Sequence, residues 1–124
     1  MEKTQYSGEE KRRFKRLYKQ FVVRIQIQSG LTKDWDVLVI RNISRGGMLF
    51  TYHKQLSEGM ILNLKINVAL NKDPIYCKGK VIHVRAFGDP RIYEAGVCFT
   101  EISVSDGDLI SRVVEDIISK KEDE

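Results

Sequence analysis

Period-two alternation of apolar and polar residues is the feature that most constrains the fold of this chain. The stretch FVVRIQIQ has an apolar side chain at every second position from Phe21 to Ile27. The stretch MILNLKINV repeats the same pattern from Met60 to Val68. Because successive side chains of a β-strand point to opposite faces, each stretch predicts a strand with one buried and one solvated side.

Four further apolar stretches are separated by turn-forming sequences. The stretches are WDVLVIRN, MLFTY, IYCKGKVIHVRAF and IYEAGVCFTEI, and the turns include QLSEGM, NKDP and GDPR. Gly79 lies inside the third of these strands and predicts a bulge or bend there. Six short strands with turns between them predict a mainly β fold, an antiparallel barrel that is closed or nearly closed over residues 19–104.

The chain ends in a different pattern. In SDGDLISRVVEDIISKK the apolar residues recur every three or four positions, which predicts a helix over residues 105–120 with one apolar stripe. Ser105 is the expected N-cap, with Asp108 three residues later. We expect this helix to pack on the barrel, the alternative being a helix that forms a dimer.

The positive charge is concentrated at the start of the chain. The net charge is +4 over 124 residues, a length typical of one domain. Residues 1–24 hold eight Lys or Arg and three Asp or Glu, whereas the remaining hundred hold thirteen and fourteen. This distribution predicts a basic N-terminal arm over residues 1–18 and a local anion site, instead of a broad basic face.

Few residues have the spacing that metal binding or catalysis requires. Cys77 and Cys98 lie in apparent strands, where a thiol acts as a small hydrophobe, and His53 and His83 are far apart in sequence. No nucleophile elbow or P-loop is present, so we expect neither an enzyme nor a metal cofactor. No apolar run is long enough to span a bilayer, and the polar N-terminus does not look like a secretion signal, so we expect a cytoplasmic protein without membrane insertion.

Two short stretches contain the residues best suited to bind a ligand. KRRFKR spaces Arg12 and Arg16 four residues apart, and guanidinium forks bind phosphates and guanine edges. NISRGGM places Asn42 and Ser44 before two glycines, which permit a close approach between backbone and ligand. Taken separately, the first also fits a solvated basic terminus and the second a β-turn or bulge.

Together, the two stretches resemble the PilZ domain family. That family has R-x-x-x-R before the first barrel strand, followed by D/N-x-S-x-x-G, and this chain has Arg12 to Arg16 and then NISRGG. The stretch YEAGVCFTEI is similar to the closing strand of the family, with Gly96 and Phe99 in the expected places. The resemblance covers about residues 10–118 and implies a six-stranded PilZ-like barrel with a C-terminal helix.

The resemblance also implies a ligand, the bacterial second messenger cyclic di-GMP. The motif arginines would grip phosphates and guanine edges, Asn42 and Ser44 would hydrogen-bond a guanine, and the last motif glycine would shape the turn and give the ligand clearance. Asn42 stands where Asp is more usual, which affects the expected affinity more than the identity of the ligand. The residues assigned in this way are Arg12, Arg13, Arg16, Asn42, Ser44 and Gly47.

A second set of candidates is weaker. His83 would stack on a base or be an ordinary strand residue, and Arg85 would contact the ligand or remain solvated. Arg45 occupies a variable position of the motif, and Lys11 would help through its charge. The second set comprises Lys11, Arg45, Gly46, His83 and Arg85.

The expected mechanism is a binding switch in signalling that regulates motility or biofilm formation. Repulsion among the arm's cations keeps the arm loose, and the dianionic ligand draws it across the barrel and changes the surface offered to an unidentified downstream protein. The alternatives are a PilZ-like adaptor that binds a protein without nucleotide, and a small-barrel RNA or DNA binder. The near-neutral barrel argues against the latter, and a monomer or weak dimer is expected.

Overall fold

The computed structural model describes residues 20–28, 30, 33–69 and 73–123. The arm candidates Lys11, Arg12, Arg13 and Arg16 therefore lie outside the described residues. Within the described part the chain forms seven strands and a C-terminal helix. They are β1 (Phe21–Ile27), β2 (Asp36–Val37), β3 (Val39–Ile43), β4 (Gly47–Tyr52), β5 (Ile61–Val68), β6 (Ile75–Phe87), β7 (Asp89–Glu101) and α2 (Val104–Asp123).

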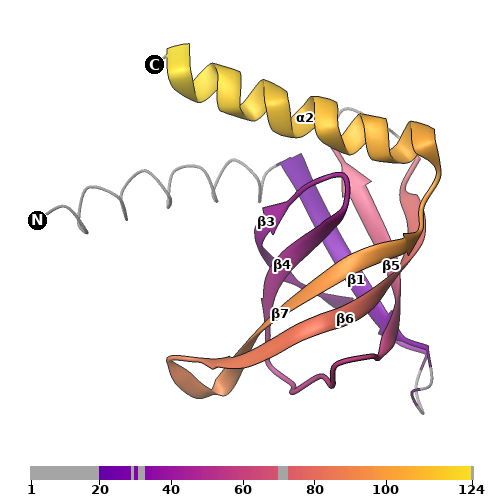
Figure 1. Cartoon of the computed structure of the whole chain (residues 1–124), viewed down its shortest axis with the longest axis vertical. Coiled ribbons are helices and arrows are strands. Elements are labelled where there is room, and N and C mark those ends of the chain that lie inside the picture. Colours follow the sequence, from indigo (N-terminus) through magenta and orange to yellow (C-terminus); the bar gives the residue numbers. More distant parts are fainter. Residues whose placement is uncertain (1–19, 29, 31–32, 70–72, 124) are drawn as a thin grey trace, which may run out of the picture.

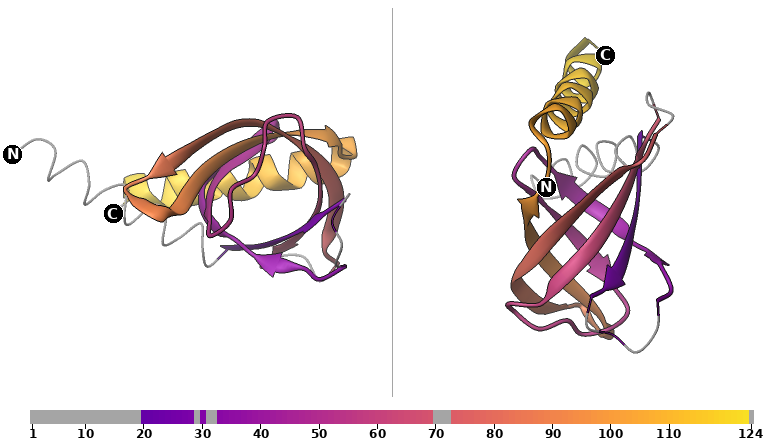
Figure 2. Two further views of the ribbon diagram at one scale, coloured as in Figure 1. Left: turned by 90° about the horizontal axis from the view of Figure 1, so that it is seen from below. Right: turned by 90° about the vertical axis from the view of Figure 1, so that its right-hand side faces the viewer.

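The strands form one antiparallel sheet in the order β2-β1-β5-β6-β7-β4-β3. The two outermost strands, β2 and β3, are neighbours in the chain and are separated only by Leu38. The segment that begins beside β1 therefore ends beside β4, and the sheet curls into a nearly closed barrel (Figures 1 and 2). The predicted mainly β barrel with a C-terminal helix is confirmed.

The prediction of a single strand over WDVLVIRN is wrong in one respect, because this stretch forms β2 and β3. The chain changes partner at Leu38, whose N–H still donates to the Val23 carbonyl oxygen of β1 at 2.9 Å. The Tyr52 hydroxyl of β4 donates a hydrogen bond to the Asp36 carboxylate of β2 and so links these two strands, which do not pair with each other. Burial, followed by this hydrogen bond and the charge of Asp36, raises the pKa of Tyr52.

The alternating residues fill the barrel as predicted. The inward side chains of β1 and β5 are almost completely buried, and each contributes about 1.5–3 kcal/mol to folding through removal of apolar surface from water. The inward residues of these two strands with at most 2% exposure are Phe21, Val23, Ile25, Leu62, Leu64, Ile66 and Val68.

The helix α2 packs on one end of the barrel (Figure 1). Ile110, Val113 and Ile117 lie at helical spacing and belong to the buried core, with at most 4% exposure. This confirms that the apolar stripe faces the barrel. The predicted N-cap is wrong, because the helix begins two residues earlier than Ser105 allows. The Asp106 N–H donates to Ser103 Oγ at 3.1 Å, so Ser103 caps the helix.

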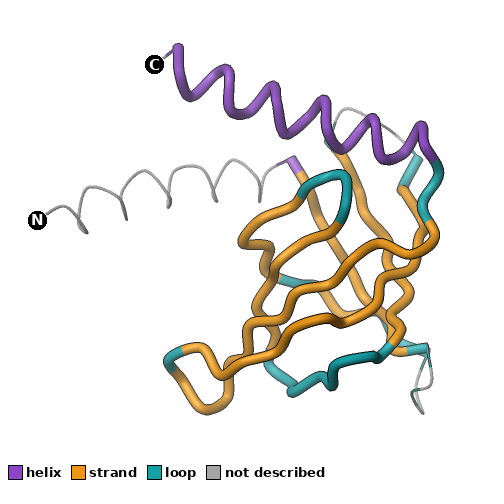
Figure 3. The backbone as a smooth tube through the Cα atoms, in the orientation of Figure 1, coloured by secondary structure: helices purple, strands orange, loops and turns teal. Residues whose placement is uncertain are grey.

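The longest hairpin, β6 and β7, extends beyond the rest of the barrel (Figure 3). The predicted four-residue turn GDPR is shorter in the structure, since β7 already begins at Asp89 and Gly88 alone has a positive φ of 73°. The register between β6 and β7 shifts between Lys78 and Gly79, which confirms the irregularity predicted at Gly79.

Candidate functional site

The NISRGG stretch forms the tight connection between β3 and β4, next to the start of α2 (Figure 3). The Ser44 N–H donates to the Gly47 carbonyl oxygen at 2.8 Å. The Ser44 hydroxyl accepts a hydrogen bond from the Gly46 N–H at 3.3 Å. The serine therefore stabilises the turn by satisfying its backbone, while its side chain stays exposed to solvent.

The two glycines of this turn have different surroundings. A Cβ atom on Gly47 would lie 2.1 Å from the Val97 carbonyl oxygen of β7, so no side chain fits there. A Cβ atom on Gly46 would meet nothing within 4 Å. The Gly46 carbonyl oxygen accepts a hydrogen bond from the Phe99 N–H at 2.9 Å, which fixes the turn to β7. Gly47 is thus required for packing, whatever its relation to a ligand.

A surface pocket of about 310 Å³ opens beside this turn, and we call it the motif pocket. The side-chain amide of Asn42 is exposed at its edge and makes no hydrogen bond within the described residues. An amide in this state offers two donors and one acceptor oxygen to a ligand. The pocket is lined by Asn42, Ile43, Ser44, Gly46, Gly47, Met48, Leu49, Ile82, Val97 and Cys98.

Next to the motif pocket, three adjacent strands bring Gly96 between two larger residues on the outer face of the barrel. Leu49 of β4, Gly96 of β7 and His83 of β6 are direct neighbours in the strand register. A Cβ atom on Gly96 would lie 3.6 Å from Leu49 and 3.7 Å from His83, which is ordinary contact. Gly96 is therefore covered by its neighbours, while the side chain of His83 beside it is exposed.

Two residues before Gly96 in β7, the buried carboxylate of Glu94 lies among three basic side chains. Its Oε1 accepts from Arg85 Nε at 2.7 Å and lies 3.8 Å from His83 Nε2, and its Oε2 lies 3.4 Å from Arg41 Nε. The hydrogen bond to Glu94, followed by the attraction of its charge, raises the pKa of Arg85. Arg85 is therefore not simply solvated, and Arg41 also lies 4.5 Å from the centroid of the Phe87 ring.

The sequence analysis did not single out Glu94 as part of the site. The available signal was local: Glu94 and Arg85 are nine residues apart in one hairpin, and both fall on its outer face. A carboxylate opposite a guanidinium in adjacent strands is a stabilising cross-strand pair. Glu94 is 4% exposed, so the cations of this cluster shield it from water.

Arg45 points away from the motif pocket. Its guanidinium forms an ion pair with Asp108 in the first turns of α2, and its side chain lies against Gly107. The structure therefore brings together Asn42, Ser44, Gly46 and Gly47, with His83 nearby. It separates Arg45 from them and joins the turn to the helix.

The other chemical groups show no metal site in the part of the chain that the structure describes. No group of three or more His, Cys, Asp or Glu residues in that part is arranged to hold a metal ion. Cys77 is buried, and burial followed by the charge of Asp106 raises its pKa to about 12. Cys98 is half-buried and lines the motif pocket. The helix α2 is not apolar enough to cross a membrane.

A small antiparallel barrel with a glycine turn and a pocket on its outer surface is the architecture of a binding module. The model of the PilZ domain family matches residues 10–116, and the chain belongs to this family. The expected family is thereby confirmed over almost the full length anticipated. No sequence among the curated proteins matches the chain closely enough to count as a relative.

Solved structures share the fold at low sequence identity. The inhibitor of motility MotI/DgrA of Bacillus subtilis is 18% identical, with a TM-score of 0.63 over 85% of this chain and 48% of that one. MrkH of K. pneumonia in its apo state is 20% identical, with a TM-score of 0.67 over 83% and 48%. A further MrkH structure, of a protein described as a c-di-GMP-dependent transcription regulatory factor, gives 0.55 at 18% identity over 82% and 45%. The chain thus spans about half the length of these proteins.

Proposed function

We propose that this chain is a receptor for cyclic di-GMP and that the motif pocket receives part of the ligand. The observation that carries the proposal is the exposed Asn42 amide, which has no hydrogen-bond partner within the described residues and stands at the rim of the motif pocket. Family membership and the likeness in fold to MrkH, which is described as depending on c-di-GMP, support the same ligand.

The chemistry of the pocket fits a guanine base. A guanine edge presents both donors and acceptors, and the Asn42 amide can pair with either kind of group. The exposed Ile82 lines the motif pocket and offers an apolar surface for the flat base. Asn42 and Ser44 would therefore hold the base edge, while the backbone of the turn sets their positions.

The surrounding charge suits the phosphates. The guanidinium groups of Arg41 and Arg85 both lie beside the Glu94 carboxylate, on the outer face of the barrel next to Gly96. We propose that Arg12 and Arg16, with Arg13 and Lys11 contributing charge, add the remaining cations from residues 1–18. Charge-assisted hydrogen bonds from guanidinium groups to phosphates are among the strongest in proteins.

The proposed activity is a switch without catalysis, in a protein located in the cytoplasm. Ligand binding would order the arm over the barrel formed by residues 19–104, and this would change the surface that a downstream protein recognises. The helix α2 would report the change through the ion pair between Arg45 and Asp108, since this pair joins the turn between β3 and β4 to the helix.

Calorimetric titration with cyclic di-GMP tests the proposal. We expect saturable binding by the wild-type chain, and a loss of at least about tenfold in affinity for Arg12→Ala and for Arg16→Ala. Lys19→Ala is the matched control, because it removes a nearby cation outside the R-x-x-x-R motif. Cyclic di-AMP is the control ligand, since it keeps the phosphates and changes the base edges. Equal binding of the two dinucleotides, or no binding of cyclic di-GMP, would contradict the proposal.

A further inference from the structure

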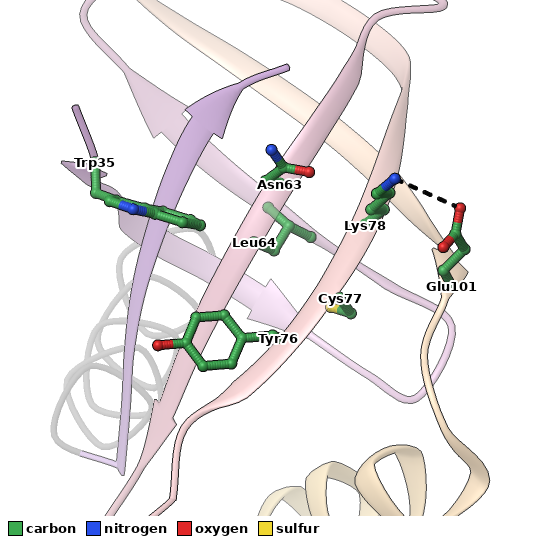
Figure 4. A pocket seen from close by; sticks show the side chains of 7 residues that line it. All are labelled: Trp35, Asn63, Leu64, Tyr76, Cys77, Lys78 and Glu101. Atoms are coloured by element: carbon green, nitrogen blue, oxygen red, sulfur yellow. Dashed lines mark ion pairs between the residues drawn. The ribbon is translucent and has the colours of Figure 1, made fainter. Parts of the chain in front are cut away.

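A second pocket is lined by different residues, mainly from β5, the first part of β6 and the end of β7, and it has a different character. Its cavity volume is about 290 Å³, and Trp35 and Tyr76 form one side of it (Figure 4). The two rings meet edge to face, with 6.5 Å between centroids and an interplanar angle of 67°. We call this the aromatic pocket, and it is lined by Trp35, Asn63, Leu64, Tyr76, Cys77, Lys78 and Glu101.

The strand register extends this pocket into a continuous outer face. One line of neighbours runs from β2 through β1 and β5 to β6, and a second line beside it runs from β1 to β7. Because residues opposite one another in adjacent strands project on the same side, each line presents its side chains together. The first line is Val37, Arg24, Lys65 and Tyr76, and the second is Gln26, Asn63, Lys78 and Glu101. With Trp35 they form what we call the aromatic face.

The aromatic face exposes large apolar side chains close together. Trp35 is 37% exposed, Val37 53% and Tyr76 62%. Single exposed apolar residues are normal on a protein surface, whereas a cluster of them marks an interaction site. Trp and Tyr are also the residues that most often dominate the binding energy of protein interfaces. Nothing in the fold requires this cluster, because the barrel core is filled from the opposite side of the same strands.

The charges of the aromatic face are unbalanced. Arg24 donates to the neutral amide oxygen of Asn67 at 3.2 Å, and the Lys65 ammonium lies 5.8 Å from the centroid of the Tyr76 ring. Lys78 and Glu101 form an ion pair at 3.9 Å, and both side chains remain partly exposed. Three cations therefore face one carboxylate in the two lines of residues. A surface of this kind attracts a partner of negative charge.

We propose that the aromatic face docks an acidic protein segment that places one large apolar side chain in the aromatic pocket, against Trp35 and Tyr76. The pocket beside the two rings has room for one such side chain. The cations on either side of the pocket would pair with carboxylates that flank this side chain in the segment. A single-stranded nucleic acid fits less well. Its successive bases stack on aromatic ring faces, and the planes of Trp35 and Tyr76 cross at 67° instead of lying parallel.

The experiment uses the chain's own reporter, since Trp35 is the single tryptophan. A short peptide of glutamates around one central phenylalanine is titrated into the full chain, and the emission of Trp35 is followed. We expect a saturable change in emission that weakens as salt is added, because exposed charges are screened. Replacing the peptide's phenylalanine by serine, or its glutamates by lysines, should weaken binding by at least about tenfold.

Variants of the protein complete the test. Tyr76→Ser and Lys65→Glu should each weaken peptide binding by about tenfold or more, because they remove one side of the pocket and reverse one charge. Val104→Ser and Arg112→Glu are the matched controls on α2, and we expect them to bind as the wild type does. Both Tyr76 and Lys65 lie outside the core, and a thermal melt verifies that each variant is folded.

Three results would overturn the proposal. The first is that the peptide causes no saturable change in Trp35 emission at millimolar concentration. The second is that Tyr76→Ser binds the peptide as tightly as the wild type does. The third is that an oligothymidine binds more tightly than the peptide and that Tyr76→Ser abolishes the binding of both. The last result would assign the aromatic face to single-stranded nucleic acid. This outcome is independent of cyclic di-GMP binding, because the motif pocket uses different residues.

Discussion

The motif pocket and the aromatic pocket have similar volumes, about 310 Å³ and about 290 Å³, but they are built differently. The motif pocket is shaped by backbone, through a tight turn whose Gly47 touches β7 and whose Gly46 carbonyl oxygen bonds to Phe99. The aromatic pocket is lined by the exposed side chains of Trp35 and Tyr76 together with two core residues, Leu64 and Cys77. Substitution of Gly47 should therefore disturb the fold, whereas substitution of the exposed Tyr76 should change the surface alone.

The largest difference is expected between Gly47→Ala and Tyr76→Ser. The alanine Cβ would collide with the Val97 carbonyl oxygen, and displacing the turn should lower the free energy of unfolding by about 2–3 kcal/mol. Tyr76→Ser should change it by less than about 0.5 kcal/mol because the ring is mostly exposed. Urea denaturation measures both. Gly46→Ala is the control within the turn and should also be nearly neutral, and equal losses in all three variants would remove the distinction between the pockets.

The border of the motif pocket should show the next largest effect. Glu94→Gln removes the charge that holds Arg41 and Arg85, while the amide keeps nearly the same shape. Because both arginines are partly exposed, the loss in unfolding free energy should be moderate, about 1–2 kcal/mol. Glu101→Gln, which breaks the exposed pair with Lys78, is the matched control and should cost less than about 0.5 kcal/mol. A larger loss in unfolding free energy for Glu101→Gln than for Glu94→Gln would show that burial of the carboxylate does not determine how much its ion pair contributes.

Substitutions of Asn42 and Asn63 compare the two pockets in the cyclic di-GMP binding assay. Asn42→Ala should weaken cyclic di-GMP binding by about tenfold, since it removes the amide from the pocket rim. Asn42→Asp should strengthen binding by about threefold, because a carboxylate accepts stronger hydrogen bonds from guanine N–H groups. Asn63→Ala, in the aromatic pocket, is the control and should leave the affinity unchanged. An increase in affinity for Asn42→Ala would exclude the proposed contact.

The two cysteines should give the smallest but most local signal, since each lines one pocket. At mildly alkaline pH, Cys98 should be alkylated faster than Cys77, whose raised pKa of about 12 keeps it a neutral, buried thiol. Cyclic di-GMP should slow alkylation at Cys98 and leave Cys77 unaffected. Mass spectrometry of Cys77→Ser and Cys98→Ser chains measures each rate. Protection of Cys77 alone would indicate that cyclic di-GMP binds at the aromatic pocket, which would contradict the proposal.

The same pKa fixes the direction of a small effect of pH on stability. The pKa of Cys77 in the folded chain lies above its ordinary value of 9.0. Below pH 9.0 the thiol is neutral in both states, and its contribution to the stability of the folded state is fully present. This contribution is lost as the pH rises from 9.0 toward about 12. Unfolding of Cys77→Ser should accordingly depend less on pH in this alkaline range than unfolding of the wild type.

The strands and the barrel were predictable because period-two alternation is a local property of the sequence. The division of WDVLVIRN was not, since the change of partner at Leu38 depends on where β1 and β4 lie in space. The N-cap was ambiguous locally: Ser103 and Ser105 both precede an aspartate by three residues. The structure resolves this because the Asp106 N–H donates to Ser103 Oγ, while Asp108 pairs with Arg45 of the turn between β3 and β4.

The candidate site was predictable where a motif is continuous in sequence. Asn42, Ser44 and the glycines lie in one turn, so their proximity follows from their spacing. The role of Glu94 required the register of β6 against β7 and the approach of Arg41 from β3. The aromatic face required more still, since Trp35 and Tyr76 are forty-one residues apart and meet only when β5 pairs with both of its neighbours.

The most direct measurement is a titration of the full chain with cyclic di-GMP, followed by the backbone amide resonances in NMR. The account predicts that the signals of Ser44, Gly46, Gly47 and Gly96 shift in a saturable way, together with those of the arm. It predicts that the signals of Gln26, Lys65 and Tyr76 on the aromatic face stay in place. The absence of any shift, or shifts concentrated on the aromatic face, would contradict the assignment of the motif pocket to this ligand.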